Sequence, residues 1–416
     1  MRSGILADGD VPVAQRIVVL GGGFAGLWSA VGAARALDEL GIGADRVEIV
    51  VVDRTAWHSI RVRNYEADLE GTRVGLDSVL GPIGVQRIEG EVSGIDVARR
   101  TVAYQADGAA RTLTYDRLVF ALGSRLAHPP IPGLDRHAFD VDTHASAERL
   151  NAHIAGLARR NPSPGQFTAL VVGGGLTGIE AAAEMPGKLS AAGAESPRVI
   201  LADHAPRIGS DMGEGALPVI DEALRALGIE TRGGVSVAAV DAEGATLASG
   251  EWIAAATIVW CAGMQAHPLT AQFPVGRDRL GRLPVEPSLK IKGLAAEFAA
   301  GDAAWFLVDG VHASVMSCQH GRPMGRFAGH NVVCDLLGRP LLPLRIDWYT
   351  TILDLGPWGA VYTEGWDRKL VSRGADAKRT KELINRQRIY PPQSGDRRAI
   401  LDAATPTVQA PPVRFG

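Results

Sequence analysis

The chain has 416 residues, of which 46% are apolar and 21% are charged, and its formal net charge is −3. This length predicts two or three domains, and this balance is typical of a globular protein. The near-neutral charge, without a basic stripe, argues against nucleic-acid binding. The segment "MRSGILADGDVPVAQR" lacks a basic start followed by an apolar run, so no signal peptide is expected.

The first predicted element is a buried parallel strand over Ile17–Leu20, followed by a helix that reaches about Leu40. A second strand, "RVEIVVVD", ends at Asp53, where a carboxylate can accept hydrogen bonds from ribose hydroxyls. A lone glycine turn could mark only a tight connection, but here strand, glycines, helix, strand and acid follow in order. They predict a dinucleotide site, to which we assign Gly21, Gly23, Phe24, Ala25, Gly26, Asp53 and Arg54.

The three glycines of this turn have the GxGxxG spacing, and each has a physical purpose. Gly21 allows the tight turn, Gly23 lets the backbone approach a pyrophosphate, and Gly26 lets the helix pack close to the strand. The free N–H groups at the helix N-terminus then bind the phosphates.

The stretch "LVVGGGLTGIE" repeats this pattern later in the chain. Its glycines are Gly173, Gly175 and Gly178, and the following strand, "PRVILAD", ends at Asp203. A carboxylate at that position repels a 2′-phosphate, so NADH is expected rather than NADPH. His204 and Arg207 lie close by in the sequence and could weaken this preference.

Two complete units predict two dinucleotides, namely a tightly held flavin and an exchangeable nicotinamide. The alternative is a duplication in which one site is inactive. That alternative is less favoured because both copies keep all three glycines and the acid.

Three further stretches make the chain resemble the FAD/NAD-linked reductases of the two-dinucleotide fold. They are "YDRLVFALGSRLAHPPIPGL" with Gly123, "TIVWCAGMQAHPL" with Gly263, and "EFAAGDAAWF" with Asp302. The resemblance covers roughly residues 15–335. It implies an α/β chain with two Rossmann-like domains of glutathione-reductase-like fold and a small C-terminal α+β domain. It also implies that Gly123, Gly263 and Asp302 contact the cofactors, with Asp302 near the ribityl phosphate of FAD.

The same resemblance divides the chain into four segments. Residues 1–150 are expected to form the first part of the FAD domain, and residues 151–285 the NAD(P)H domain. Residues 286–335 would complete the FAD domain. Residues 336–416 would form a C-terminal interface or acceptor-side domain with a loose tail.

The chain resembles the type II NADH dehydrogenase branch most. Its cysteines, Cys261, Cys318 and Cys334, form no redox pair, and thiol chemistry is therefore not expected. Three stretches carry the resemblance: "DRTAWHSIRVRNYEA", "GGGLTGIEAAAE" and "SVMSCQHG". It implies catalytic roles for Glu180, near flavin and nicotinamide, and for Gln319, near the acceptor. His58 could be a proton donor or a hydrogen-bonded structural residue.

The chain departs from that branch at four positions near the expected flavin face and acceptor site. Arg61, Arg63 and Asn64 replace apolar residues or glutamine, and Val315 replaces a glutamine. Because unpaired buried charge is costly, the arginines either point to solvent or FAD phosphates, or they face an acceptor more polar than ubiquinone. Arg61, Arg63 and Val315 are therefore candidate substrate residues.

The C-terminal region predicts a strand pair within "IDWYTTILDLGPWGAVYTEGWDRKLV", then a basic helix within "GADAKRTKELINRQRIY". The helix could lie at a dimer or domain surface. Alternatively, its cations could meet anionic lipid, these being Lys378, Arg379, Lys381, Arg386 and Arg388. The ten histidines show no HExxH or similar spacing, so no metal site is proposed.

These observations predict a cytoplasmic FAD-dependent NAD(P)H oxidoreductase that could contact the inner face of a membrane and could form a homodimer. Electrons would pass from NADH to FAD and on to a small-molecule acceptor, which could be a quinone. One alternative is a biosynthetic flavoenzyme acting on a polar small molecule. Another is a flavoprotein that binds NADH as a sensor without useful turnover.

Overall fold

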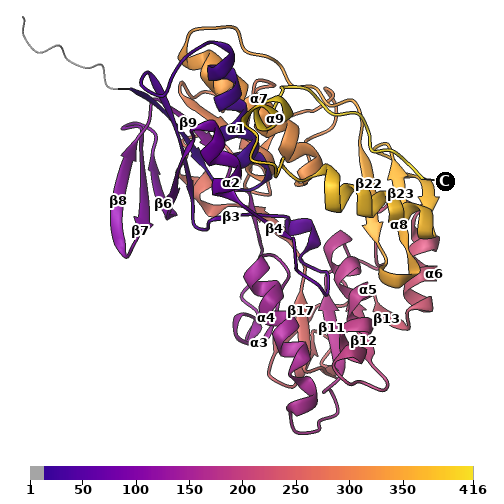
Figure 1. Cartoon of the computed structure of the whole chain (residues 1–416). Coiled ribbons are helices and arrows are strands. Elements are labelled where there is room, and N and C mark those ends of the chain that lie inside the picture. The colour runs from indigo at the N-terminus through magenta and orange to yellow at the C-terminus, as the bar shows by residue number, and fades with distance from the viewer. Residues whose placement is uncertain (1–13, 416) are drawn as a thin grey trace, which may run out of the picture.

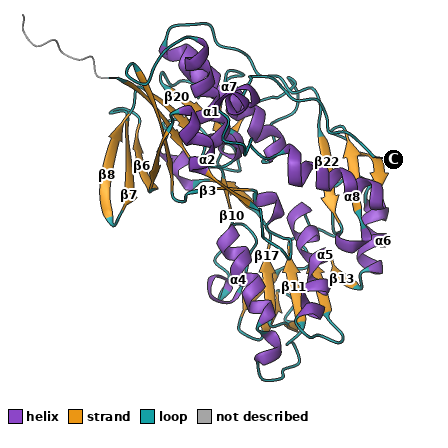
Figure 2. Cartoon of the chain, viewed as in Figure 1, coloured by secondary structure: helices purple, strands orange, loops and turns teal. Residues whose placement is uncertain are grey.

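The computed structural model describes residues 14–415, and parallel sheets form the centres of two of its units (Figures 1 and 2). Residues 1–13, which carry most of the segment considered for a signal peptide, lie outside this range. The first sheet has five parallel strands in the order β20-β9-β1-β2-β5. They are β1 (Gln15–Leu20), β2 (Val47–Asp53), β5 (Gln86–Glu89), β9 (Arg117–Phe120) and β20 (Glu297–Ala299).

The second unit repeats this architecture with four parallel strands in the order β13-β12-β11-β17. They are β11 (Thr168–Val172), β12 (Arg198–Ala202), β13 (Ile229–Arg232) and β17 (Thr257–Trp260). The helices of the two units include α1 (Phe24–Glu39), α2 (Leu76–Leu80), α3 (Leu134–His137), α4 (His144–Ala155), α5 (Leu176–Ala191) and α6 (Leu217–Ala226). Both predicted strand–turn–helix–strand units are thus present.

Small antiparallel sheets accompany each unit. The sheet β6-β7-β8 stands at the outer edge of the first unit (Figure 1), and β14-β15-β16 belongs to the second. Their strands are β6 (Glu91–Asp96), β7 (Thr101–Ala106), β8 (Ala109–Thr114), β14 (Val237–Val240), β15 (Gly244–Leu247) and β16 (Trp252–Ala254). Two short pairs complete the first unit: β3 (Trp57–Ser59) with β4 (Arg73–Gly75), and β19 (Leu283–Pro284) with β21 (Ala304–Trp305).

The chain crosses between the units through one antiparallel pair, β10 (Ser124–Leu126) and β18 (Met264–Ala266). Helix α4 belongs to the second unit, because Leu150 and Ile154 are buried in that unit's core. The crossings therefore lie at β10 and β18, earlier than residues 150 and 285.

A long helix, α7 (Cys318–Leu336), lies against α1 in the first unit (Figure 1). Glycines on α7 make this contact close: a Cβ atom on Gly325 would lie 2.4 Å from the Ala25 carbonyl oxygen. The N-terminal half of α7 is thereby held beside the first glycine turn.

The C-terminal region forms the third unit, a three-stranded antiparallel sheet with a helix packed on it, where a strand pair was expected. Its elements are β22 (Thr350–Asp354), β23 (Ala360–Glu364), β24 (Lys369–Arg373), α8 (Gly374–Leu383), a π-helical turn (Ile384–Arg388) and α9 (Arg397–Ala403). This unit contacts α5 of the second unit and continues into segments beside α7 (Figure 1).

The residues after α9, expected to form a loose tail, lie against the protein. The Trp348 indole donates a hydrogen bond to the Gln409 carbonyl at 3.1 Å, and the Phe415 amide donates to Thr380 Oγ1 at 3.3 Å. Within residues 14–415, no helix is long and apolar enough to span a bilayer.

Candidate active site

The first glycine turn has the geometry of a phosphate-binding site. A Cβ atom on Gly23 would meet no heavy atom within 4 Å, so open space lies in front of the N-terminus of α1. A Cβ atom on Gly26 would lie 1.8 Å from the Gly21 carbonyl oxygen, so only glycine allows this packing of helix on strand. Asp53 Oδ2 accepts a hydrogen bond from the Gly22 amide at 2.6 Å, which fixes the turn from the end of β2.

The second turn reproduces this arrangement. Gly175 also faces open space, and a Cβ atom on Gly178 would lie 1.7 Å from the Gly173 carbonyl oxygen. The Asp203 carboxylate accepts hydrogen bonds from the amides of Gly174 and Ala205. Each turn thus presents a helix N-terminus beside a carboxylate, and the residues present fit one dinucleotide at each.

His58 lies on β3 behind the first turn and is fully buried. Its Nδ1 is 2.9 Å from the Gly22 carbonyl oxygen, and its ring contacts Phe24 edge to face. Burial lowers the pKa of His58 to about 4, so the ring is neutral at neutral pH. A neutral ring that donates from Nδ1 has no proton to donate from Nε2, so the geometry favours the structural interpretation of this residue.

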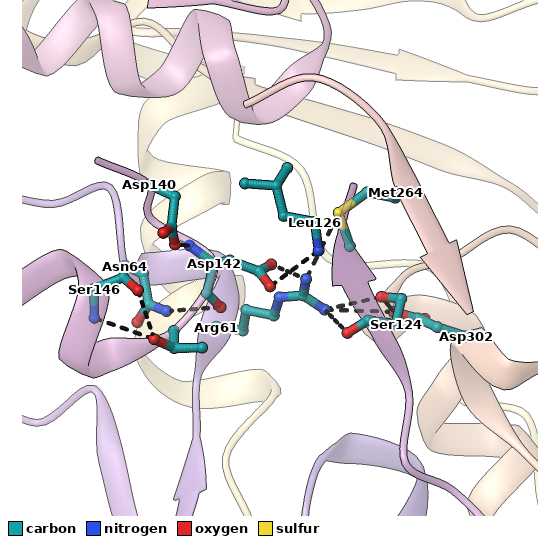
Figure 3. A network of polar contacts seen from close by, with 10 residues as sticks. Arg61, Asn64, Ser124, Leu126, Asp140, Asp142, Ser146, Met264 and Asp302 are labelled. Carbon is teal, nitrogen blue, oxygen red and sulfur yellow. Dashed lines mark hydrogen bonds and ion pairs between the residues drawn. The ribbon is translucent and has the colours of Figure 1, made fainter. Parts of the chain in front are cut away.

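Arg61 lies at the centre of a polar network where the two nucleotide-binding units meet (Figure 3). Its guanidinium pairs with Asp142, donates to Ser124 Oγ at 2.9 Å, and lies 3.8 Å from Asp302 Oδ2. Ser124 Oγ in turn donates to Asp302 at 2.6 Å, beside Gly123. Burial raises the pKa of Asp302, and the guanidinium of Arg61 opposes this rise.

Arg63 makes a different set of contacts. It pairs with Glu66 at 2.6 Å and donates a hydrogen bond to the Tyr390 hydroxyl at 2.7 Å, which links the first unit to the C-terminal region. Both arginines therefore have carboxylate partners within the protein. The structure gives them interdomain contacts, which were not among the alternatives considered from the sequence.

Glu180 lies on the first turns of α5 and is buried against the C-terminal unit. Its Oε1 accepts hydrogen bonds from Lys381 Nζ at 2.6 Å and from the Asp354 amide at 3.0 Å. The Tyr65 hydroxyl donates to Asp354 Oδ2 at 3.0 Å, which joins the first unit to this network. Burial raises the pKa of Glu180, and the Lys381 ammonium opposes the rise.

Lys378 and Lys381 of α8 were considered as cations for anionic lipid. Lys381 is buried on Glu180, and Lys378 pairs with Asp354 at 2.6 Å. These two lysines are therefore internal partners of acids. The sequence indicated a basic helix correctly, but spacing alone could not reveal acids so distant along the chain.

Gln319, at the start of α7, lines a cavity of about 70 Å³ between α7, β22 and the C-terminal segments. Its Oε1 accepts a hydrogen bond from Thr350 Oγ1 at 3.0 Å, while its buried Nε2 has no partner among residues 14–415. The lining residues are Cys318, Gln319, Arg322, Pro323, Arg326, Trp348, Thr350, Ile384, Arg388, Ile389, Val408, Gln409 and Pro412.

The other residues assigned from the sequence are placed as follows. Val315 precedes α7 and does not line this cavity. Its amide donates a hydrogen bond to His320 Nδ1 at 2.9 Å. Gly263 directly precedes β18 at the crossing between the units, and Arg54 is exposed beside Asp53. Burial raises the pKa of the Cys318 thiol.

Sequence reasoning missed three arginines, Arg322, Arg326 and Arg388, which lie around the Gln319 cavity. Arg322 and Arg326 are four residues apart on one helix, a spacing that puts both on one face and could have drawn attention to them. No local signal connects them to Arg388, which comes from the π-helical turn near the C-terminus.

Comparison with known proteins identifies the class to which this fold and site belong. Residues 15–325 match the family described as pyridine nucleotide-disulphide oxidoreductase. The chain belongs to this family. The expected enzyme class, an FAD-dependent NADH oxidoreductase of the two-dinucleotide fold, is thereby confirmed.

The chain is also similar to individual proteins of known sequence or structure. An NADH dehydrogenase-like protein of Mycobacterium tuberculosis is 57% identical over 401 residues, which cover 95% of this chain and 100% of the relative. A type II NADH:quinone oxidoreductase of the same organism is 29% identical, with 79% of this chain and 74% of the relative covered. The structure of NDH2 from Plasmodium falciparum in complex with NADH has a TM-score of 0.75 at 12% identity, covering 94% and 97%.

Proposed function

We propose that this protein oxidises NADH through bound FAD and transfers the electrons to a quinone-type acceptor at the Gln319 cavity. The observation that carries this proposal is the combination of two open glycine turns with a separate cavity beside α7. The relatives named NADH dehydrogenase-like and NADH:quinone oxidoreductase support the same reaction class.

The protein's own residues would bind and orient the reactants. The N-termini of α1 and α5 would bind the phosphates of FAD and NADH, respectively. Once bound, the flavin supplies the redox chemistry, taking hydride from the nicotinamide and giving electrons to the acceptor. The unpartnered Gln319 Nε2 would donate a hydrogen bond to an acceptor oxygen in the cavity.

A steady-state assay tests this function. FAD-loaded protein is given NADH with a quinone, ferricyanide, oxygen or small polar acceptors, one at a time. We expect quinone to support the fastest NADH oxidation. A protein that binds NADH but does not oxidise it with any of these acceptors would instead be a sensor, and preference for a non-quinone organic acceptor would favour the biosynthetic alternative.

The first prediction concerns the bound flavin. Purified protein should be yellow and should release FAD, not FMN, on denaturation, because the open turn at Gly23 and the nearby Asp53 fit a dinucleotide. Absorbance spectroscopy followed by chromatography of the released cofactor measures this. Colourless protein that does not take up added FAD would contradict the assignment.

The second prediction concerns nicotinamide choice. The Asp203 carboxylate lies at the second turn, and Arg207, which could attract a 2′-phosphate, pairs with Asp221 at 3.0 Å. We expect kcat/KM for NADH to exceed that for NADPH by about tenfold or more, equal to roughly 1.4 kcal/mol. Asp221→Asn should release Arg207 and narrow the gap. A native preference for NADPH would overturn this assignment of Asp203.

Membrane contact and dimer formation remain predictions. Because Lys378 and Lys381 pair with acids inside the protein, fewer cations of α8 are available to lipid than its sequence indicates. Sedimentation with and without anionic vesicles would measure the first prediction, and analytical ultracentrifugation the second.

A further inference from the structure

The Gln319 cavity concentrates positive charge that no acid of the described chain neutralises. Arg322 and Arg326 are 6% and 3% exposed, respectively, and both line the cavity. The Nε atoms of both lack a hydrogen-bond partner among residues 14–415, and no carboxylate of that range pairs with either guanidinium. Arg388 lines the same cavity, and its guanidinium donates to the Ala410 carbonyl oxygen.

A buried guanidinium normally has a carboxylate or phosphate partner, because desolvation of an unpaired cation is costly. Here Trp28 of α1 packs beneath the two arginines, with its ring centroid 4.5 Å from Arg326 Cζ and 5.5 Å from Arg322 Cζ. This cation–π contact does not neutralise the charge of either guanidinium. Burial lowers the pKa of Arg326 to about 9, the direction expected for neighbouring cations without a counter-anion.

The contrast with other arginines of the protein is informative. The buried Arg63 and Arg282, and the half-buried Arg61, each have a carboxylate partner in the structure. The arginines at the cavity therefore differ from these three, because no carboxylate among residues 14–415 pairs with them.

We propose that Arg322, Arg326 and Arg388 bind an oxyanion group, a carboxylate or phosphate, carried by the electron acceptor in the Gln319 cavity. The geometry of a guanidinium suits bidentate binding of either group. At about 70 Å³ the cavity holds roughly five waters, enough for one such group. The assignment rests on the proposed function, because it names the acceptor class of the same site.

The test uses FAD-loaded protein and a matched acceptor pair: a 1,4-naphthoquinone with a short carboxylate side chain, and its methyl ester. We expect the acid to have a KM lower than that of the ester by about tenfold to a hundredfold, the range of a charge-assisted hydrogen bond. The difference between the KM values of the acid and the ester should disappear in Arg326→Gln and Arg388→Gln, while the rate of flavin reduction by NADH is unchanged. Arg326→Lys should retain part of it.

Arg386→Gln is the matched control, since Arg386 lies on the same π-helical turn, is exposed and does not line the cavity. It should leave the preference for the acid unchanged. Equal KM values for acid and ester in the native protein would overturn the proposal. So would a loss of FAD content in the Arg326 or Arg388 variants, which would make these arginines cofactor ligands.

Two further measurements separate the remaining outcomes. Inorganic phosphate should compete with the acid. Inhibition by phosphate without any preference for the acid over the ester would indicate a site for free oxyanions and overturn the assignment to the acceptor. Arg326→Gln should not lower the midpoint of thermal unfolding, because an unpaired buried cation is removed. A fall of several degrees would indicate a structural arginine and contradict the proposal.

Failure of the proposed function is distinguishable from failure of this inference. If NADH reduces the flavin but neither quinone reoxidises it, the quinone reaction is wrong. Isothermal titration calorimetry of the acid into the oxidised native protein and Arg326→Gln then still tests the arginine site. Binding that the variant loses would support the site, and equal or absent binding would overturn it.

Discussion

Replacing Lys381 by methionine is expected to lower the free energy of unfolding by about 3 to 5 kcal/mol, because the change leaves Glu180 buried without its cation. The two side chains meet at 2.6 Å, and both are more than nine-tenths buried. Urea-induced unfolding of the FAD-loaded protein measures the loss. The pair also joins α5 to α8, so the same variant should weaken the contact between the second unit and the C-terminal unit.

The pH dependence of this loss has a definite sign. Burial raises the pKa of Glu180 in the folded protein, and removal of the ammonium raises it further. A carboxyl whose folded pKa exceeds its unfolded pKa contributes more stability as pH falls. The deficit of the Lys381→Met variant should therefore shrink as the pH is lowered from neutrality.

Two variants serve as controls for this prediction. Lys378→Met, on the same helix, should cost less than Lys381→Met, because the lysine side chain is 26% exposed and Asp354 keeps its hydrogen bonds from the Tyr65 hydroxyl and the Gly356 amide. The double variant Glu180→Gln/Lys381→Met removes both charges and should recover most of the loss. Equal stability of Lys381→Met and the native protein at neutral pH would contradict the buried ion pair.

The second large effect is expected at the two glycine turns, where a single substitution should weaken binding at one nucleotide site and leave the other unchanged. Gly23 and Gly175 occupy equivalent positions, and a Cβ atom at either would meet no protein atom within 4 Å. Alanine should therefore fit the unliganded protein but occupy space that a pyrophosphate needs. Gly23→Ala should weaken FAD binding, and Gly175→Ala should weaken NADH binding, each by roughly 10-fold to 100-fold from an overpacking cost of about 1–3 kcal/mol.

The two measurements are different for the two variants. FAD retained after dialysis measures the first, and the KM for NADH of protein saturated with FAD measures the second. Each variant is the control for the other, because Gly175→Ala should keep its FAD. Exchanged effects would mean that the two sites have been assigned in the wrong order.

Much of the nucleotide-binding architecture could be predicted because its signals are local. The strand, three glycines, helix and terminal acid of each unit fall within a short stretch, and their spacing reflects backbone geometry that only glycine allows, as at Gly26 and Gly178. The sequence also indicated the basic helix that became α8. The acids Asp53 and Asp203 lie at the strand ends where they were predicted. In this structure, however, their carboxylates accept hydrogen bonds from backbone amides of the glycine turns.

The parts that could not be predicted depend on contacts between distant segments. Arg61 meets Asp142 across the crossing between units, and Lys381 meets an acid 201 residues earlier in the chain. Neither partner is marked by spacing or composition. The three cavity arginines similarly come from α7 and the π-helical turn, and only the fold brings them together around Gln319.

The most direct test of the account follows the visible absorbance of the bound flavin in an anaerobic stopped-flow experiment. NADH is mixed with the FAD-loaded protein, and a quinone is added in a second mixing step. We expect NADH to bleach the absorbance and the quinone to restore it, each at a rate at least equal to that of steady-state turnover. Absorbance that NADH leaves unchanged, or that no quinone restores, would contradict the proposed reaction.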